Sequence, residues 1–167
     1  ERLLLMKYDV VIRCRNEIEW LPRVIKSLKY QSVNPEKIIL VDNNSDDGSK
    51  EFAINENCVI VNYDKSEFNY SYSLNLGINE TNQANILILS AHCEIVTQTS
   101  VQNMLEVRKY YDAAGVFGRQ IPTIKSSPID TRDLITVFGR ERIIYKNYPF
   151  FHNAFSLIDR KAWEMCK

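Results

Sequence analysis

The stretch KIILVDNNSDDGS, residues 37–49, sets the expectation for the fold. Residues 38–41 are all apolar, whereas a strand with one solvent-exposed face would alternate apolar and polar residues. Such a run is typical of a strand that is buried on both faces of a parallel sheet. A polar turn follows Asp42, and a short helix is expected near 48–55. The stretch therefore predicts one strand–turn–helix unit of a layered α/β fold.

Similar units lie on both sides of this stretch. Leu21, Val24, Ile25 and Leu28 follow the spacing of one helix face, after an apolar run that is rich in β-branched residues. The expected strands are 8–14, 37–42, 58–63, 84–90 and 114–121, and the expected helices are 19–28, 48–55, 70–80 and one after Thr97. This alternation predicts an α/β fold with a mostly parallel, Rossmann-like sheet and helices on both of its faces.

The pattern loosens after Gln120. Residues 122–131 are expected to form a loop, Leu134–Phe138 a short amphipathic piece, and Asp159 the cap of a last helix. That helix has no stop signal before Lys167, so we expect one domain over residues 1–167 that is incomplete at its C-terminus.

Composition excludes several classes of function. The 167 residues contain 21 Lys and Arg and 21 Asp and Glu, which argues against a nucleic-acid-binding surface. The four cysteines are far apart and have no metal-ligand spacing, so free thiols in a reducing compartment are expected. The opening residues 1–6 contain only a four-residue apolar run, too short for a signal sequence or a membrane span. The sequence predicts a cytoplasmic protein.

Polar side chains gather where the expected strands end. In parallel sheets ligands bind beyond the carboxyl ends of the strands, so these residues are the candidates for a site. They are Arg13, Arg15, Asn16 and Glu17 after the first strand, Asp42 after the second, Ser90, His92 and Glu94 after the fourth, and Arg119 after the fifth. Ser90, His92 and Glu94 alternate, and they would point to one side if the chain stayed extended.

The aspartate-rich turn has an alternative interpretation as a calcium-binding loop. With Asp42 at position one, Asp47 occupies the position that requires glycine and Ala53 the position that requires glutamate. Calcium is therefore excluded, and Asp42 is better suited to accept hydrogen bonds from a base or a ribose. Asp46 and Asp47 are expected to cap the following helix.

Several segments together resemble a known family. They are VVIRCRNEIEWLPRVIKSLKYQS (10–32), IILVDNNSDDGS (38–49), FNYSYSLNLGI (68–78), LSAHCEI (89–95), VFGRQIP (116–122) and HNAFSLIDRKAWE (152–164). In this order they are similar to family-two glycosyltransferases of the GT-A fold, in particular to rhamnosyltransferase-like bacterial members that build surface polysaccharides. The resemblance covers nearly the whole chain.

This resemblance implies an inverting transfer of a sugar from a nucleotide-diphosphate donor to a saccharide or lipid-linked acceptor, in capsule, exopolysaccharide or lipopolysaccharide synthesis. The donor-binding residues that it implies are Arg13, Arg15, Asn16, Glu17, Asp42, Asn75 and Ser90. Arg119 is added to them as a further bidentate donor for the diphosphate. The metal-binding D-x-D of the family aligns with Ser90–Ala91–His92, so both aspartates are absent.

Three interpretations of this departure stay open. His92 and Glu94 would hold a divalent cation, with a preference shifted from Mg²⁺ toward Mn²⁺. Alternatively, Arg13, Arg15 and Arg119 would neutralise the diphosphate and reduce the need for a metal. A structural role for His92, without any ligand, is a third interpretation.

The resemblance also has consequences for catalysis. The family's general base would lie beyond Lys167, so the isolated chain is expected to be poorly active. A non-catalytic nucleotide-sugar-binding module is the alternative function. The protein is expected in the cytoplasm, at most peripheral to the inner face of the membrane. The aromatic residues of 145–151, with His152 and Asn153, are interpreted either as core or as part of a sugar pocket.

Overall fold

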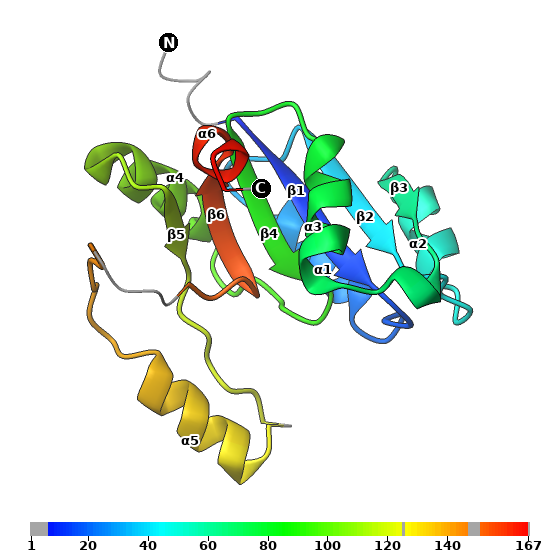
Figure 1. Ribbon diagram of the computed structural model, residues 1–167. Coiled ribbons are helices and arrows are strands. Elements are labelled where there is room, and N and C mark those ends of the chain that lie inside the picture. The colour runs from blue at the N-terminus through cyan, green and yellow to red at the C-terminus, as the bar shows by residue number, and fades with distance from the viewer. Residues whose placement is uncertain (1–6, 125, 147–150, 167) are drawn as a thin grey trace.

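The computed structural model of the protein describes residues 7–124, 126–146 and 151–166. Six strands form one sheet in the order β3-β2-β1-β4-β6-β5 (Figure 1). The strands are β1 (Tyr8–Cys14), β2 (Lys37–Asp42), β3 (Val59–Asn62), β4 (Asn85–Ser90), β5 (Gly115–Phe117) and β6 (Phe155–Asp159). Neighbouring strands in the group β3-β2-β1-β4 are parallel, while β6 runs antiparallel to both β4 and β5. The predicted mostly parallel α/β sheet is confirmed.

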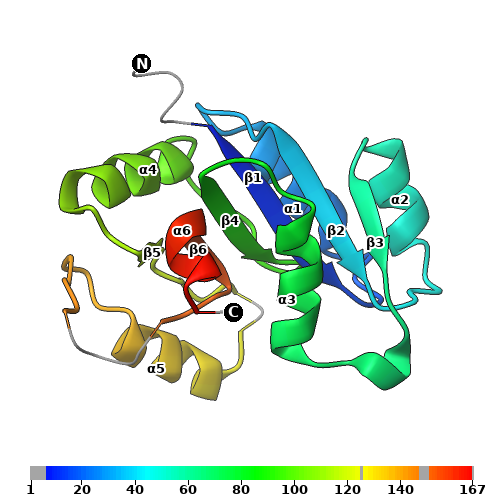
Figure 2. The ribbon, with the colours of Figure 1, turned by 45° about the horizontal axis from the view of Figure 1, so that its top comes forward.

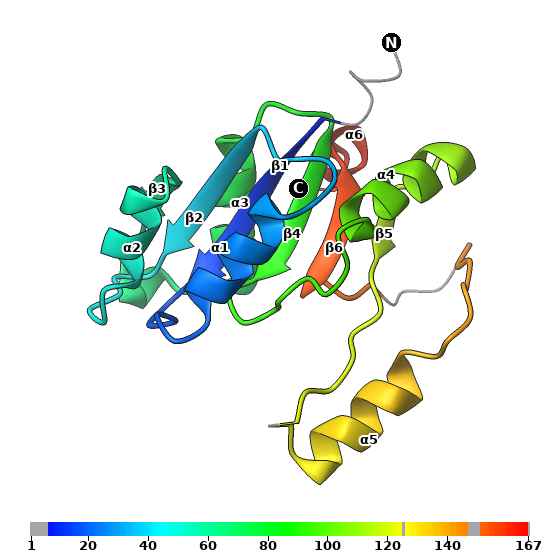
Figure 3. The ribbon, with the colours of Figure 1, turned by 180° about the vertical axis from the view of Figure 1, so that it is seen from behind.

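Helices cover both faces of this sheet, as expected. The α-helices are α1 (Leu21–Lys29), α2 (Ser49–Asn55), α3 (Tyr70–Asn79), α4 (Ser100–Tyr111), α5 (Pro128–Val137) and α6 (Arg160–Glu164). Of these, α5 lies away from the sheet and covers neither face (Figure 1). Helix α3 crosses the front of the sheet in Figure 1, and α1 crosses the back, as the reverse view in Figure 3 shows. Helix α6 lies beside β6 on the face of α3, which the turned view in Figure 2 makes clear.

The core consists of two apolar clusters, one on each face of the sheet. On one face, Val10, Ile12 and Cys14 of β1 pack with the buried stripe of α1 and with α4. On the other face, Val11 packs with Leu74 and Ile78 of α3. Because successive side chains of a strand alternate between faces, Arg13 points to the face of α3. The sheet thereby carries Arg13 to the carboxyl edge on that face.

Several sequence predictions need correction. Strand β6 was not predicted. The predicted cap of the following helix is confirmed, because Asp159 accepts a hydrogen bond from Ala162 N at 3.1 Å at the start of α6. The fifth strand is three residues long instead of 114–121, and it pairs only with β6. Residues 128–131, expected in a loop, begin helix α5, whose N-cap is Ser127. A proline at the first helical turn and an accepting serine before it explain this start.

The aromatic cluster lies where β5 meets the chain before β6. Phe117 stacks on Tyr145 with the rings 6.2 Å apart, and it makes edge contacts with Phe138 and Phe151. Tyr148 and Phe150 lie outside the described residues. Across the described part of the chain, no helix is both long enough and apolar enough to cross a membrane.

Candidate functional site

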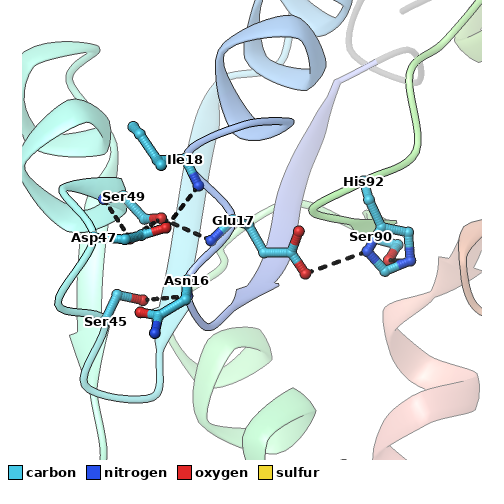
Figure 4. A network of polar contacts seen from close by, with 8 residues as sticks. All are labelled: Asn16, Glu17, Ile18, Ser45, Asp47, Ser49, Ser90 and His92. Atoms are coloured by element: carbon cyan, nitrogen blue, oxygen red, sulfur yellow. Dashed lines mark hydrogen bonds and ion pairs between the residues drawn. The ribbon is translucent and has the colours of Figure 1, made fainter.

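Two turns meet at the carboxyl edge of the sheet. Asn16, in the turn after β1, adopts a left-handed conformation with a φ of 55°. Its backbone N–H donates to Ser45 Oγ at 3.0 Å, and its side-chain amide exchanges two hydrogen bonds with Asp46. Asparagine tolerates this backbone region better than most residues. The β1–α1 turn is therefore fixed to the β2–α2 turn (Figure 4). Asp46, which was expected to cap α2, bonds to Asn16 instead, and the N-cap position of α2 is Gly48.

Asp47 is the second link between the two turns. Its carboxylate accepts hydrogen bonds from Ile18 N at 2.9 Å, and from Ser49 N and Ser49 Oγ at 2.9 and 2.6 Å. Burial raises the pKa of Asp47, but these hydrogen bonds outweigh it and hold the pKa below its ordinary value. Asp47 therefore orders the first turn of α2 and the entry to α1 together.

Replacing Asp47 with alanine is expected to lower the free energy of unfolding at neutral pH by about 1 kcal/mol, because several hydrogen bonds to a charged group are lost. The pKa of Asp47 is lower in the folded than in the unfolded protein. The stabilisation by Asp47 is therefore fully present above the unfolded-state pKa of about 3.9 and is lost as the pH falls through the pKa of the folded state. Urea denaturation of both proteins at a series of pH values measures the difference. Asp133→Ala, which removes an exposed carboxylate on α5, is the control. A difference that grows on acidification contradicts the prediction.

Asp42 is completely buried at the end of β2. Its two carboxylate oxygens accept hydrogen bonds from Ser45, at 3.0 Å from the backbone N–H and 2.5 Å from the hydroxyl. Asp42 is the register partner of Cys14, so both side chains lie on the face of α1, opposite to Arg13. Burial raises the pKa of the Cys14 thiol to about 11, and the Asp42 charge acts in the same direction. The structure thus gives Asp42 a role in holding the turn.

A cavity of about 330 Å³ opens on the other face, beside the ends of β1 and β4. Its described lining consists of Arg13, Tyr70, Ser90, Phe151, His152, Asn153 and Ala154. Arg13 and Ser90 are register partners on adjacent parallel strands, which puts their side chains next to each other. Ser90 N also donates to Ala154 O at 2.8 Å, so the lining segment 151–154 is fixed to the end of β4. This volume lies at the lower end of the range for small-ligand sites.

Ser90, His92 and Glu17 form a chain of polar contacts next to this cavity (Figure 4). Ser90 Oγ lies 3.1 Å from His92 Nε2, and His92 Nδ1 lies 3.4 Å from Glu17 Oε1. The side chain of His92 is 60% exposed, against 25% for Glu17. The carboxylate that meets this imidazole therefore comes from the turn after β1, which the sequence did not predict.

Glu94 lies away from this chain of contacts. Strand β4 ends at Ser90, and Cys93 N donates to Ser90 O at 3.0 Å, which closes a turn. The chain is thus not extended from Ser90 to Glu94, and the premise that their side chains share one side is wrong. Glu94 Oε2 instead pairs with Arg23 Nη2 at 3.0 Å.

These positions decide whether the site fits a divalent cation. Ser90 and Ala91 offer no charged oxygen, Glu94 is held by Arg23, and Asp42 is buried with Ser45. The residues described in the structure contain no group of three or more His, Cys, Asp and Glu side chains that is arranged to hold a metal ion. Mg²⁺ and Mn²⁺ prefer several oxygen ligands, so the side chains at this position do not fit such an ion.

The other predicted donor residues are spread over the surroundings. Arg15 is exposed in the turn after β1. Asn75 lies on α3, and its buried Oδ1 has no hydrogen-bond partner among the described residues. Arg119 lines a different cavity, of about 910 Å³, between α4, β5 and residues 137–145. The structure therefore brings Arg13 and Ser90 together, with Asn16 and Glu17 in the turn after β1, and it places Arg119 on the wall of the other cavity.

Two important residues of the cavity were not singled out from the sequence as donor-binding. Tyr70, the first residue of α3, places its ring 4.9 Å from the Arg13 guanidinium carbon. His152 accepts hydrogen bonds at Nδ1 from Gln120 Nε2 at 2.8 Å and Ala154 N at 3.3 Å. Burial lowers the pKa of His152, which favours the same neutral form. The position of Tyr70 after the third strand was the available signal, because that helix starts at the carboxyl edge.

Comparison with known proteins gives matches to one family. The profile of the family described as glycosyl transferase family 2 matches residues 9–165. The O-antigen chain rhamnosyltransferase RfbN of Salmonella typhimurium is 28% identical over 126 residues, which is 74% of this chain and 40% of RfbN. The chain thus spans less than half the length of this curated relative.

Solved structures show the same fold at low sequence identity. The mannosyltransferase PcManGT from Pyrobaculum calidifontis, in complex with GDP-Man and Mn²⁺, superimposes with a TM-score of 0.65 at 13% identity, over 95% of this chain and 46% of its own. TarS 1–349 of S. aureus, in complex with UDP-GlcNAc, gives a TM-score of 0.55 at 14% identity, over 70% of this chain and 37% of its own. The fold is therefore that of the GT-A enzymes.

Proposed function

The chain belongs to glycosyl transferase family 2, and we propose that it is an inverting enzyme that transfers a sugar from a nucleotide-diphosphate donor to a saccharide or lipid-linked acceptor. The observation that carries the proposal is the cavity at the carboxyl edge, lined by Arg13 and Ser90 from adjacent parallel strands. This is the edge at which α/β sheets bind ligands. Nucleotide sugars bound to PcManGT and TarS support the same donor class.

The acceptor and the pathway are proposed from the relative. RfbN is an O-antigen chain rhamnosyltransferase, which supports a role in the synthesis of a bacterial surface polysaccharide. We propose that the protein acts in the cytoplasm, at the inner face of the membrane. The residues described at the cavity wall include no carboxylate, so this cavity itself supplies no Asp or Glu as general base.

One set of binding experiments tests the donor site. We expect UDP, dTDP or GDP to bind with a measurable heat in calorimetry and to raise the melting temperature, as a ligand that binds only the folded state must. The corresponding nucleosides, which lack the diphosphate, are the control and are expected to bind more weakly. Failure of all three diphosphates to bind contradicts the proposed donor class.

A non-catalytic binding module is the second candidate function. The observation that favours it is the replacement of the family's two aspartates by Ser90 and His92. Both candidates bind nucleotide sugars, so binding alone does not separate them. Release of nucleoside diphosphate from a sugar donor in the presence of acceptor polysaccharide does, since only an enzyme turns the donor over.

A further inference from the structure

Arg13 is a half-buried cation without an anionic partner. Within the described part of the chain its guanidinium makes no hydrogen bond and no ion pair, and its recorded contact is the Tyr70 ring at 4.9 Å. Burial lowers the pKa of Arg13, while Tyr70 and Tyr63 act in the opposite direction. A guanidinium keeps its charge under such a shift. Charged groups in protein interiors are normally paired, so this position calls for an anion.

The protein itself supplies no such anion to the cavity. The described lining residues include no carboxylate, and His152 accepts two hydrogen bonds at Nδ1 as a neutral imidazole does. The acidic side chains that follow β1, β2 and β4 at this edge of the sheet are engaged elsewhere. They are Asp42 with Ser45 on the opposite face, Glu17 with His92, and Glu94 with Arg23. Arg13 therefore gives the cavity its net charge.

The orientation of Arg13 suits a phosphate oxygen pair. A guanidinium above an aromatic ring uses its face for that contact, and its N–H donors lie in the plane and stay available. Arginine binds phosphate in a bidentate manner with two parallel hydrogen bonds. Ser90, the register partner of Arg13, adds a hydroxyl to the same cavity wall.

We propose that Arg13 binds the diphosphate of the donor directly, in place of a divalent cation, so that the nucleotide binds without metal. This inference rests on the proposed function, because it takes the nucleotide diphosphate as the ligand. It follows from the poor fit of Ser90, Ala91 and His92 to a metal and from the unpaired charge of Arg13 in the same cavity. Arg13 is then a binding residue that holds the leaving group.

Calorimetry with UDP, dTDP and GDP tests the proposal in EDTA and in Mn²⁺. At least one of the three is expected to bind in EDTA with the same affinity as in Mn²⁺. Binding that requires Mn²⁺ overturns this inference and leaves the proposed function intact. Absence of binding in both conditions contradicts the proposed function itself, so the two failures are distinguishable.

Variants of Arg13 locate the anion. Arg13→Ala is expected to weaken binding of the nucleoside diphosphate in EDTA by about 10- to 100-fold, because charge-assisted hydrogen bonds to the phosphate are lost. Arg13→Lys keeps the charge but loses the planar guanidinium, so its affinity in EDTA is expected to lie between that of the parent protein and that of Arg13→Ala. Arg132→Ala removes an exposed arginine on α5 and is the matched control, with unchanged affinity. Unchanged affinity in both Arg13 variants overturns the proposal.

Ser90→Asp tests the same point with a gain of metal dependence. A carboxylate beside Arg13 competes with the diphosphate for the guanidinium, and it also repels the diphosphate. We expect weaker binding than in the parent protein in EDTA and partial recovery in Mn²⁺, because the new carboxylate supplies an oxygen ligand. Affinity in EDTA equal to that of the parent shows that the diphosphate does not lie beside Ser90, which contradicts the proposal.

Discussion

Replacing Arg108 with methionine is expected to lower the free energy of unfolding by about 2–3 kcal/mol, because it leaves the buried Asn85 and the partly buried Asp159 without their cationic donor. Arg108 extends from α4 and donates to Asn85 Oδ1 at 2.7 Å and to Asp159 Oδ2 at 2.9 Å. Its side chain is 14% exposed, and that of Asp159 is 23% exposed. Asn85 begins β4 and Asp159 ends β6, so one guanidinium joins the parallel half of the sheet to its antiparallel edge. Urea denaturation with both proteins at equal concentration measures the loss.

The exposed ion pair on α5 supplies the control for this prediction. Arg132 Nη2 lies 2.7 Å from Asp133 Oδ1, but the two side chains are 72% and 57% exposed. Arg132→Met is expected to change the free energy of unfolding by no more than about 0.5 kcal/mol, as exposed pairs do. Equal effects of Arg108→Met and Arg132→Met would show that the buried contacts contribute nothing beyond a surface pair.

Gly77→Ala is expected to destabilise the protein by about 2–3 kcal/mol, although the same change usually stabilises a helix by up to about 1 kcal/mol. A Cβ at Gly77 would lie 2.5 Å from Val11 Cγ1 and 2.6 Å from Val41 Cγ2. Both valines are completely buried in the sheet. Helix α3 lies against β1 and β2 at the distance that glycine permits, so a methyl group forces the helix away from the sheet. A lower midpoint of urea denaturation measures the effect.

A second glycine and a double variant test whether the clash with Val11 causes the loss of stability. Gly139→Ala introduces a methyl group with no heavy atom within 4 Å, and it is expected to leave stability nearly unchanged. Combining Gly77→Ala with Val11→Ala is expected to cost less than the sum of the two single changes, since the second removes the clashing methyl groups. Additive losses would show that contact with Val11 is not the source of the strain.

The parallel half of the fold was predictable because its strands are apolar on both faces. The predicted bounds of β1 and β2, 8–14 and 37–42, are those observed. Strand β6 was missed because Phe155–Asp159 is short, carries Ser156 in its interior and directly precedes a helix, so no periodicity marks it. Its place between β4 and β5 is set by tertiary contacts that no local pattern encodes.

The site was predictable only where strand ends determine it. The carboxyl edge followed from the parallel sheet, and with it the proximity of Arg13 and Ser90. The partner of His92 was not predictable, since it depends on a turn at Ser90 that sends Glu94 toward Arg23 and leaves Glu17 beside the imidazole. Arg119 follows β5, which β6 separates from β4, so its distance from Arg13 depends on the strand that was missed.

The late position of β6 in the chain has a consequence for synthesis. Strand β4 pairs through Asn85–Leu89 with Phe155–Asp159, about seventy residues later. While the ribosome is still producing the intervening segment, the nascent sheet exposes an open edge made of residues 86–89, all of them aliphatic. Such an edge is a template for pairing with another chain. Chaperone demand and inclusion-body formation in cells should therefore depend on how soon residues 155–159 emerge.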